Sequence, residues 1–568
     1  MRLRSFSFHP GRRSADAGFS QPENSGGMTP CQKNTLRILI LIGILYFVLM
    51  LFPNLTGART PEMLSVFEVD EYAQYSHVID MLTPGSSFYQ SLRNFFVYLH
   101  YFYGYPFYFW SALFLLPVRI LGGADWTSHT RLIVCLLRQM ISVLPMILSA
   151  LILTSLGTKF KDRTLSILTF LFLLLLPAVV TNDFWWHPDS LALFFAVLTF
   201  FFLEKDAFRG GKYFYFAAAA CGAATGTKYT GLYFCLAIPL YLVLAVLRRT
   251  LSAKKAAGRA LLFLLIMAVF VVITNPLLLL PQERAEIIRV QKLQAQETGT
   301  GIFTVQHASF FDSGLIPDDI RRNYGGYLIV ALTLAGMLAL IFRGSRDARD
   351  EMLVLSAYLL VAALVPILSA SRRLHYFLPV LLPFFAALSA AYRNIRSAAV
   401  SRGMKKLLMG ICLLSVMYQF GMNISRDVTL YQSQLRREAD SASIALYQEI
   451  REQLLPALKM PENRMLRIFR DWKVYYPETP GKTVVNMNWE MITLDQIEDW
   501  HPDLIILEKE NIRMFSDPSI LENAVNQDRM QAVQHFYALA ASDAIPDFHA
   551  ELENSFGTVY VKNEIAGK

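Results

Sequence analysis

Residues 165–203 read LSILTFLFLLLLPAVVTNDFWWHPDSLALFFAVLTFFFL, and they indicate the fold class. Two apolar runs, 165–181 and 190–203, flank a short polar and aromatic turn, TNDFWWHPD. A helix needs about 20 mainly apolar residues to cross a bilayer, so the stretch predicts two membrane spans and a tight loop. The whole chain is only 17% charged, against about 25% in soluble proteins. The sequence therefore predicts a polytopic α-helical membrane protein.

Apolar runs of this kind recur eleven times along the chain. They are 36–53, 132–156, 165–181, 190–203, 213–227, 231–247, 260–280, 326–342, 352–370, 376–392 and 405–422. A polar tail, residues 1–35, precedes the first run and is too long for the charged region of a cleavable signal peptide. The first run is therefore predicted to be a signal anchor.

Basic residues gather in six clusters between these runs. Cytoplasmic loops carry an excess of Lys and Arg, and an N-terminus in the cytoplasm would place all six clusters there. Alternation across eleven spans then puts the C-terminus outside. The net charge of +8 reflects this bias, so a nucleic-acid partner is rejected. The expected location is the cell (inner) membrane.

The apolar stretch 105–121 must not cross fully, because a further span would invert every later loop. Its start, YPFYFW, is rich in aromatic residues that suit the membrane interface. We expect a juxtamembrane helix at the outer face; an ordinary span with an unrecognised partner is the alternative. The outer segments are then 54–131, 181–189, 281–325 and 371–375.

The last part of the chain, 423–568, mixes two helix-like stretches with four strand-like ones, RMLRIF, KTVVNMN, DLIILE and TVYVK. This mixture predicts an α/β domain. Thr493 to Gln496 fits a helix capping box within it. The predicted organisation is a cytoplasmic tail over 1–35, a transmembrane catalytic domain over 36–422 and an extracytoplasmic α/β domain over 423–568.

Two acids, Asp70 and Glu71, open a helical pattern in the first outer segment, FEVDEYAQYSHVIDML. Neighbouring helical residues diverge by about 100°, so only one carboxylate can face a given point. Acids at a helix start are also favoured by the helix dipole alone.

The next candidates lie in TNDFWWHPD and GTKYTG. His187 and Asp189 stand at the mouth of a span, where an interfacial belt and a helix start would also explain them. Lys228 lies between two short apolar runs, and a lysine near the membrane is costly unless it pairs or reaches the interface.

The segment SRRLH supplies Arg372, Arg373 and His375 on the outer side, against the positive-inside bias. An anionic ligand at the outer surface would explain this cluster. Outer-face acids could deprotonate an acceptor hydroxyl, and outer-face cations could stabilise a leaving phosphate. The combination suits transfer from a lipid-linked phosphate.

Six segments, in order, resemble the GT-C superfamily of membrane glycosyltransferases, in particular the protein O-mannosyltransferase and lipid A aminoarabinose transferase-like group. They are Asp70-Glu71-Tyr72, GYPFYFWSALFLLPVRILG, Arg131-Leu132, HPDSLALFFAVLTFFFLEK, GAATGTKYTGLYF and RRLHYFLPVLLPFFAAL, within residues 36–392. The chain departs from the usual pattern at Tyr105-Pro106-Phe107 and at Arg373-Leu374-His375-Tyr376. The sugar and the subfamily therefore stay open.

The resemblance implies an inverting glycosyltransferase that moves a sugar from a polyprenyl-phosphate donor to a hydroxyl of a lipid, glycan or protein. It implies Asp70 as the general base, with Glu71 assisting the acceptor or binding a cation. His187 and Asp189 would position the acceptor or the first loop. The donor phosphate would be bound by Arg131, Lys228, Arg372, Arg373 and His375. No cofactor is certain; a divalent cation near the two acids stays open.

Two other functions remain. A transporter or lipid flippase would need ionisable residues buried in mid-span, and the predicted spans are nearly free of them. A non-catalytic scaffold for envelope assembly would leave the basic cluster at 372–375 unexplained.

Overall fold

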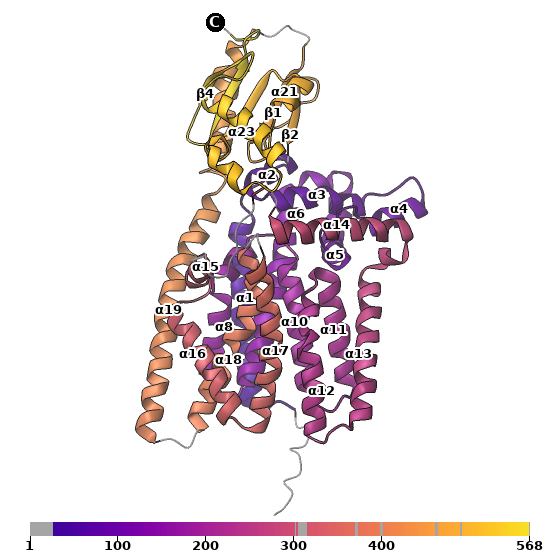
Figure 1. Ribbon diagram of the computed structural model, residues 1–568, viewed down its shortest axis with the longest axis vertical. Coiled ribbons are helices and arrows are strands. Elements are labelled where there is room, and N and C mark those ends of the chain that lie inside the picture. The colour runs from indigo at the N-terminus through magenta and orange to yellow at the C-terminus, as the bar shows by residue number, and fades with distance from the viewer. Residues whose placement is uncertain are drawn as a thin grey trace, which may run out of the picture.

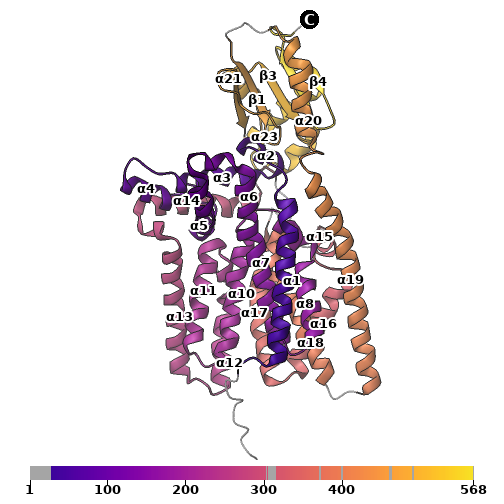
Figure 2. The ribbon, with the colours of Figure 1, turned by 180° about the vertical axis from the view of Figure 1, so that it is seen from behind.

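The computed structural model describes residues 27–301, 303–304, 315–369, 373–397, 401–459, 464–488 and 491–566. Long helices form a bundle, a layer of shorter helices covers one end of it, and a small α/β domain stands above that layer (Figure 1). Figure 2 shows the same three levels from behind. The first turn of α1 (Pro30–Asn54) and the C-terminal domain lie at opposite ends of the molecule.

Thirteen helices of the described chain make up the bundle. They are α1, α6 (Thr130–Leu137), α7 (Leu144–Thr158), α8 (Arg163–Leu174), α9 (Pro177–Asp183), α10 (Asp189–Asp206), α11 (Lys212–Lys228), α12 (Ala237–Leu247), α13 (Ala253–Thr274), α16 (Tyr327–Arg343), α17 (Arg346–Leu368), α18 (Leu378–Ser397) and α19 (Arg402–Arg436). A π-helical turn, Arg138–Val143, joins α6 to α7 without a break. Large apolar side chains of α13, including Leu261 and Leu264, are exposed, as expected of a surface in contact with lipid.

Each of the eleven predicted spans overlaps helical residues of this bundle. Within the described residues, seven helices are long and apolar enough to cross a membrane, and the pair α8–α9, bent by 60°, would make an eighth. The helix α10 is not among them, and it carries four charged residues in its end turns, Asp189, Glu204, Lys205 and Asp206. The chain is thus a multi-pass membrane protein, whereas the number eleven stays a prediction.

The covering layer contains α2 (Leu64–Phe67), α3 (Val69–Leu82), α4 (Phe88–Phe96), α5 (Tyr105–Gly122) and α14 (Pro281–Thr300). In both views α5 lies in this layer rather than along the bundle (Figures 1 and 2). Its hydropathy alone would also suit a span. The helix α14 was not expected, because residues 281–325 were predicted to be a loop. A second short helix, α15 (Leu315–Asn323), follows it.

The C-terminal domain has a five-stranded sheet in the order β2-β1-β3-β5-β4. The strands are β1 (Leu466–Asp471), β2 (Thr483–Asn488), β3 (Leu504–Glu508), β4 (Phe548–Glu553) and β5 (Gly557–Lys562). β1 runs parallel to β2 and β3, and β5 runs antiparallel to β3 and β4. Alternate residues of β3 face opposite sides: Ile505 packs with α23 (Gln527–Ala541), and Ile506 with α20 (Ala442–Glu449). Two further helices are α21 (Leu494–Trp500) and α22 (Lys509–Ser516).

The residues after α14 attach to the C-terminal domain. The Val525 N–H donates to the Phe303 carbonyl at 3.0 Å, and Thr304 forms an isolated β-bridge with Ala524. The Phe303 ring stacks near Trp472, with centroids 6.5 Å apart. The C-terminal domain therefore holds the end of a helix that covers the bundle.

Candidate active site

A cavity of about 190 Å³ lies where the covering layer meets the bundle. Asp70 of α3 and Glu297 of α14 contribute carboxylates to its wall, and Lys228 and Arg373 contribute cations. His187, His375 and the rings of Tyr103 and Tyr376 complete the polar part of the lining. The fold thus brings together residues that are more than 300 positions apart in sequence.

Asp70 lies in the first turn of α3, where the helix dipole favours a negative charge. Its carboxylate lines the cavity and forms no hydrogen bond or ion pair with any described residue. A carboxylate without a protein partner is available to accept a proton from a ligand.

Glu71 points away from the cavity. Its side chain is fully buried, and the Arg138 guanidinium donates to both of its carboxylate oxygens, with Nε 2.7 Å from Oε1. The Trp186 N–H donates to the same Oε1 at 2.8 Å. The predicted direct role of Glu71 in catalysis or cation binding therefore does not agree with this placement, because its hydrogen-bonding capacity is already taken by Arg138 and Trp186.

The neighbouring acid, Glu68, is the N-cap residue of α3. Burial, together with the nearby Glu71 carboxylate, raises the pKa of Glu68 to about 8. Glu68 is therefore protonated at neutral pH and does not compete with Glu71 for Arg138.

Lys228 is the last residue of α11, and a close backbone contact sets its position. A Cβ at Gly104 would lie 1.7 Å from the Gly226 carbonyl oxygen, so only glycine fits there. The Gly104 N–H donates to the Thr227 carbonyl at 3.2 Å. The start of α5 therefore lies directly against the end of α11, and the ring of Tyr103 lies 5.9 Å from the Lys228 ammonium.

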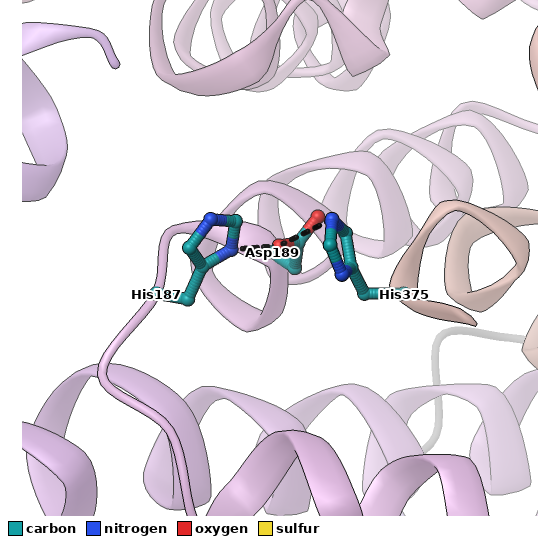
Figure 3. Close-up of side chains that lie close together, drawn as sticks. All are labelled: His187, Asp189 and His375. Atoms are coloured by element: carbon teal, nitrogen blue, oxygen red, sulfur yellow. Dashed lines mark hydrogen bonds and ion pairs between the residues drawn. The ribbon is translucent and has the colours of Figure 1, made fainter. Parts of the chain in front are cut away.

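Asp189, the first residue of α10, is the centre of a buried polar cluster. The Lys228 ammonium lies 2.6 Å from its Oδ1. His187 Nδ1 bonds to Oδ2, and His375 Nε2 lies 4.0 Å from the same oxygen. Figure 3 shows the two imidazoles on either side of the carboxylate. The other nitrogen of His187 lies 2.7 Å from the Tyr103 hydroxyl, which fixes the ring against the start of α5.

Arg373 is exposed at the cavity wall and has no ion-pair partner among the described residues. It precedes a 3₁₀ turn, Leu374–Phe377, that carries His375 and Tyr376. A guanidinium without a carboxylate partner is suited to binding an anion such as phosphate. Arg372, predicted to act with it, lies outside the described residues.

Arg131 lies elsewhere. It is the second residue of α6, and its guanidinium pairs with Glu438, which also pairs with Arg59. Arg131 lines neither this cavity nor the larger one beside it. Its predicted contact with the donor phosphate is therefore not supported; it joins the bundle to the start of the C-terminal domain.

His187, Asp189 and His375 are also the one group of three described residues whose ligand atoms lie close enough for a metal ion, all within 4.8 Å of one another. Two imidazoles and a carboxylate would suit zinc. However, the Lys228 ammonium already neutralises Asp189, so bound metal would have to displace it. Within this cluster the charge of Asp189 is therefore balanced by Lys228.

A second cavity of about 640 Å³ adjoins the first, and Lys228, His375 and Tyr376 line both. Its walls come from α11, α13, α14 and α17, and they include apolar side chains such as Leu278 and Val361. A mainly apolar space between these helices thus adjoins the charged cavity.

The sequence did not reveal Arg138, Tyr103 or the α14 residues Gln294, Glu297 and Thr298. Arg138 had a signal, because it is an arginine inside the predicted span 132–156, and such residues are costly unless they pair. The expectation that the spans would be nearly free of ionisable residues missed it. The α14 residues had no comparable signal in a segment expected to be a loop.

A family model described as dolichyl-phosphate-mannose-protein mannosyltransferase matches residues 133–273. The predicted resemblance to GT-C glycosyltransferases is confirmed. The match runs from α6 almost to the end of α13, so it includes His187, Asp189 and Lys228. Asp70 and the 373–376 segment of this GT-C-like chain lie outside it. No curated protein matches the chain significantly.

Two solved structures are similar at low identity. ArnT from Cupriavidus metallidurans bound to undecaprenyl phosphate is 12% identical, with a TM-score of 0.47 over 93% of this chain and 98% of that one. The archaeal oligosaccharyltransferase AglB from Archaeoglobus fulgidus, in complex with an inhibitory peptide and a dolichol-phosphate, is 11% identical, with a TM-score of 0.49 over 88% and 72%. These values are too low for residue roles to be transferred.

Proposed function

We propose that this GT-C-like glycosyltransferase is an inverting enzyme that transfers a sugar from a polyprenyl-phosphate donor to an acceptor hydroxyl. The observation that carries the proposal is the shared cavity. The Asp70 carboxylate and the Arg373 guanidinium line this one small space, and neither is paired with a residue that the structure describes. The reaction needs one base for the acceptor and cations for the leaving phosphate.

The larger cavity supports a donor with a polyprenyl chain. A polyprenyl chain needs an apolar path between helices, and the space between α13, α14 and α17 provides one. The path ends at Lys228 and Arg373, where a lipid-linked phosphate would meet its counter-charges. The matched family is described by the same donor chemistry, a dolichyl-phosphate-linked sugar.

The proposed chemical step uses the side chains that line the cavity. Asp70 accepts the proton of the acceptor hydroxyl as its oxygen attacks the anomeric carbon. The bond from that carbon to the phosphate oxygen breaks, and the electron pair stays on the phosphate, near Arg373 and Lys228. Asp189 orients Lys228, and His187 orients Asp189. This single displacement, with the base and the leaving phosphate on opposite sides of the sugar, would invert the configuration at the anomeric carbon.

We infer that the site opens on the extracytoplasmic side of the cell (inner) membrane. The C-terminal domain and the site lie at the bundle end opposite the start of α1, the helix that follows the basic tail in the sequence. The positive-inside rule assigns that tail to the cytoplasm. The acceptor, a lipid, glycan or protein, would therefore be one that is exposed outside the cytoplasm.

The proposal is tested with purified protein in lipid nanodiscs and a panel of polyprenyl-phosphate hexoses and pentoses. At least one donor should release polyprenyl phosphate, and nuclear magnetic resonance of the product should show inversion at the anomeric carbon. A retained configuration would exclude the single-base mechanism. Turnover of none of the donors, by protein that binds polyprenyl phosphate, would contradict transferase activity.

A further inference from the structure

A third cavity, of about 310 Å³, lies at the other end of the bundle. Its walls come from α7, α10, α12, α17 and α18. The rise of 1.5 Å per residue places Glu204 in its mouth about 22 Å along α10 from Asp189. The side chain of Gln32, at the start of α1, donates to the Lys159 carbonyl at 2.9 Å, which fixes this mouth at the bundle end where α1 begins. The cavity is therefore separate from the catalytic site.

The inner part of this cavity is apolar and its mouth is charged. Leu153, Phe200 and Leu355 are among the residues that line the inner part. The volume is at the lower end of the range of ligand cavities, about 300–1,000 Å³. An elongated apolar group, with a polar head at the membrane interface, would match this division.

Most of the charged side chains at the mouth are paired. Lys159 pairs with Glu204. Arg248 pairs with Asp347 and with Asp350, which also contacts Arg349.

Glu351, in the first turns of α17, is the acid left over. Its carboxylate forms no hydrogen bond or ion pair with any described residue, although Lys159 and Arg393 act on it electrostatically. It is also largely removed from solvent, so a ligand that donates hydrogen bonds to it would replace lost water.

We propose that this cavity binds one acyl chain of an aminophospholipid, with the ammonium headgroup on Glu351 and the phosphate near Lys159 and Arg248. Both cations are partly accessible at the mouth, with 26% of the Lys159 side chain and 13% of the Arg248 side chain exposed. An anionic lipid would bring its phosphate to the same cations, but it would leave Glu351 unpaired. The proposed site therefore prefers a headgroup with an ammonium group over an anionic headgroup.

Native mass spectrometry of the full chain, delipidated and then given dioleoyl phosphatidylethanolamine or dioleoyl phosphatidylglycerol, tests this site. The wild-type protein should retain one phosphatidylethanolamine about tenfold more tightly than phosphatidylglycerol, a difference of about 1.4 kcal/mol, because only the ammonium headgroup can donate a charged hydrogen bond to Glu351. Glu351→Gln should remove this preference. The control Glu510→Gln, an exposed acid of the C-terminal domain, should keep it.

Ala387→Phe tests the acyl-chain part, because Ala387 lines the inner cavity and a phenyl ring would fill it. Loss of the retained lipid in this variant, with a monodisperse elution profile, supports the site. Equal retention of the two lipids by the wild type, or an unchanged preference in Glu351→Gln, would overturn the proposal. Full retention in Ala387→Phe would likewise place the lipid elsewhere.

Discussion

The guanidinium of Arg138 holds both oxygens of the Glu71 carboxylate, inside the bundle and out of reach of solvent. Asp70, one residue earlier on the same helix, turns its carboxylate into the cavity. The two adjacent acids therefore have different roles. Glu71 anchors α3 to the bundle, whereas Asp70 is paired with no described residue and can bind a ligand.

Asp70→Asn keeps the size of the side chain and removes the base. Transfer should fall by about 10²–10⁴-fold, the usual contribution of a general base. The measurement is the rate of polyprenyl phosphate release from a turned-over donor, with donor binding followed separately. Asp80→Asn, an exposed position on the same helix, is the matched control and should keep full activity. Near-normal transfer by Asp70→Asn would remove Asp70 from the mechanism.

Arg138→Gln should destabilise the protein by about 3–5 kcal/mol, because it leaves the buried Glu71 charge without its partner. Thermal unfolding in detergent measures the loss. Replacing both partners by apolar residues, Glu71→Leu with Arg138→Met, should cost much less than the sum of the two single changes. Strictly additive losses would show that the two side chains do not depend on each other.

Arg373→Gln should raise the KM for the donor more than it lowers kcat, because the guanidinium binds phosphate in the bound donor as well as in the transition state. Steady-state kinetics with a fixed acceptor concentration measures the two constants. Arg289→Gln, an exposed arginine on α14 that pairs with Glu286, serves as the control. A donor KM that is unaltered by Arg373→Gln would argue against phosphate binding there.

Glu68 gives a pH dependence whose direction is fixed. Its pKa is about 8 in the folded protein, against an ordinary value of 4.5. Between these two pH values the folded state keeps a proton on Glu68 that the unfolded state releases. The contribution of Glu68 to the free energy of unfolding is therefore fully present below pH 4.5 and is lost as the pH rises through about 8. The unfolding temperature of Glu68→Gln should fall less across this window than that of the wild type. Parallel curves for the two proteins would be inconsistent with a buried, protonated Glu68.

Topology is tested by labelling single cysteines in intact cells. Glu564→Cys, exposed in the C-terminal domain, should react with an impermeant maleimide, and Lys254→Cys should react only after lysis. The exposed Cys31 and Cys235 are first replaced by serine. The reverse labelling pattern would place the candidate site in the cytoplasm.

Hydropathy was a good guide to the bundle, because apolar runs of membrane length have few other uses. The runs at 36–53 and 352–370, for example, overlap α1 and α17. It failed at α14, PQERAEIIRVQKLQAQETGT, which is polar and lies across the bundle end. A proline at its start and a content of Ala, Glu, Gln and Lys are signals of a helix. A search for apolar runs passes over them.

Short sequence patterns predicted most of the C-terminal domain. The predicted capping box is present before α21, where the Thr493 N–H donates to Gln496 Oε1 at 3.1 Å. Four strands overlap the expected segments, whereas β4, FHAELE, was missed because it is an edge strand with mostly polar residues.

The site was only partly readable from the sequence. Lys228 was noticed because a charge beside an apolar run is costly and therefore conspicuous. Asp70 and Asp189 were named from their outer-face positions and from the family resemblance. The bond from Lys228 to Asp189 was not predicted, since it depends on how α10 and α11 lie together. The likeness of Arg131 to a family motif did not bring it to the cavity, because Glu438 of the following domain captures its charge.

The hydrogen bond from Val525 to Phe303 attaches the C-terminal domain to the residues that follow α14. The helix carries Gln294, Glu297 and Thr298 into the cavity wall, and in its middle Gln291 donates to the Tyr101 carbonyl at 2.6 Å. Cutting the chain after α19 would remove the contact that holds the residues following this helix. A shortened enzyme would therefore position these three side chains less firmly, even though no residue of the cavity had been removed.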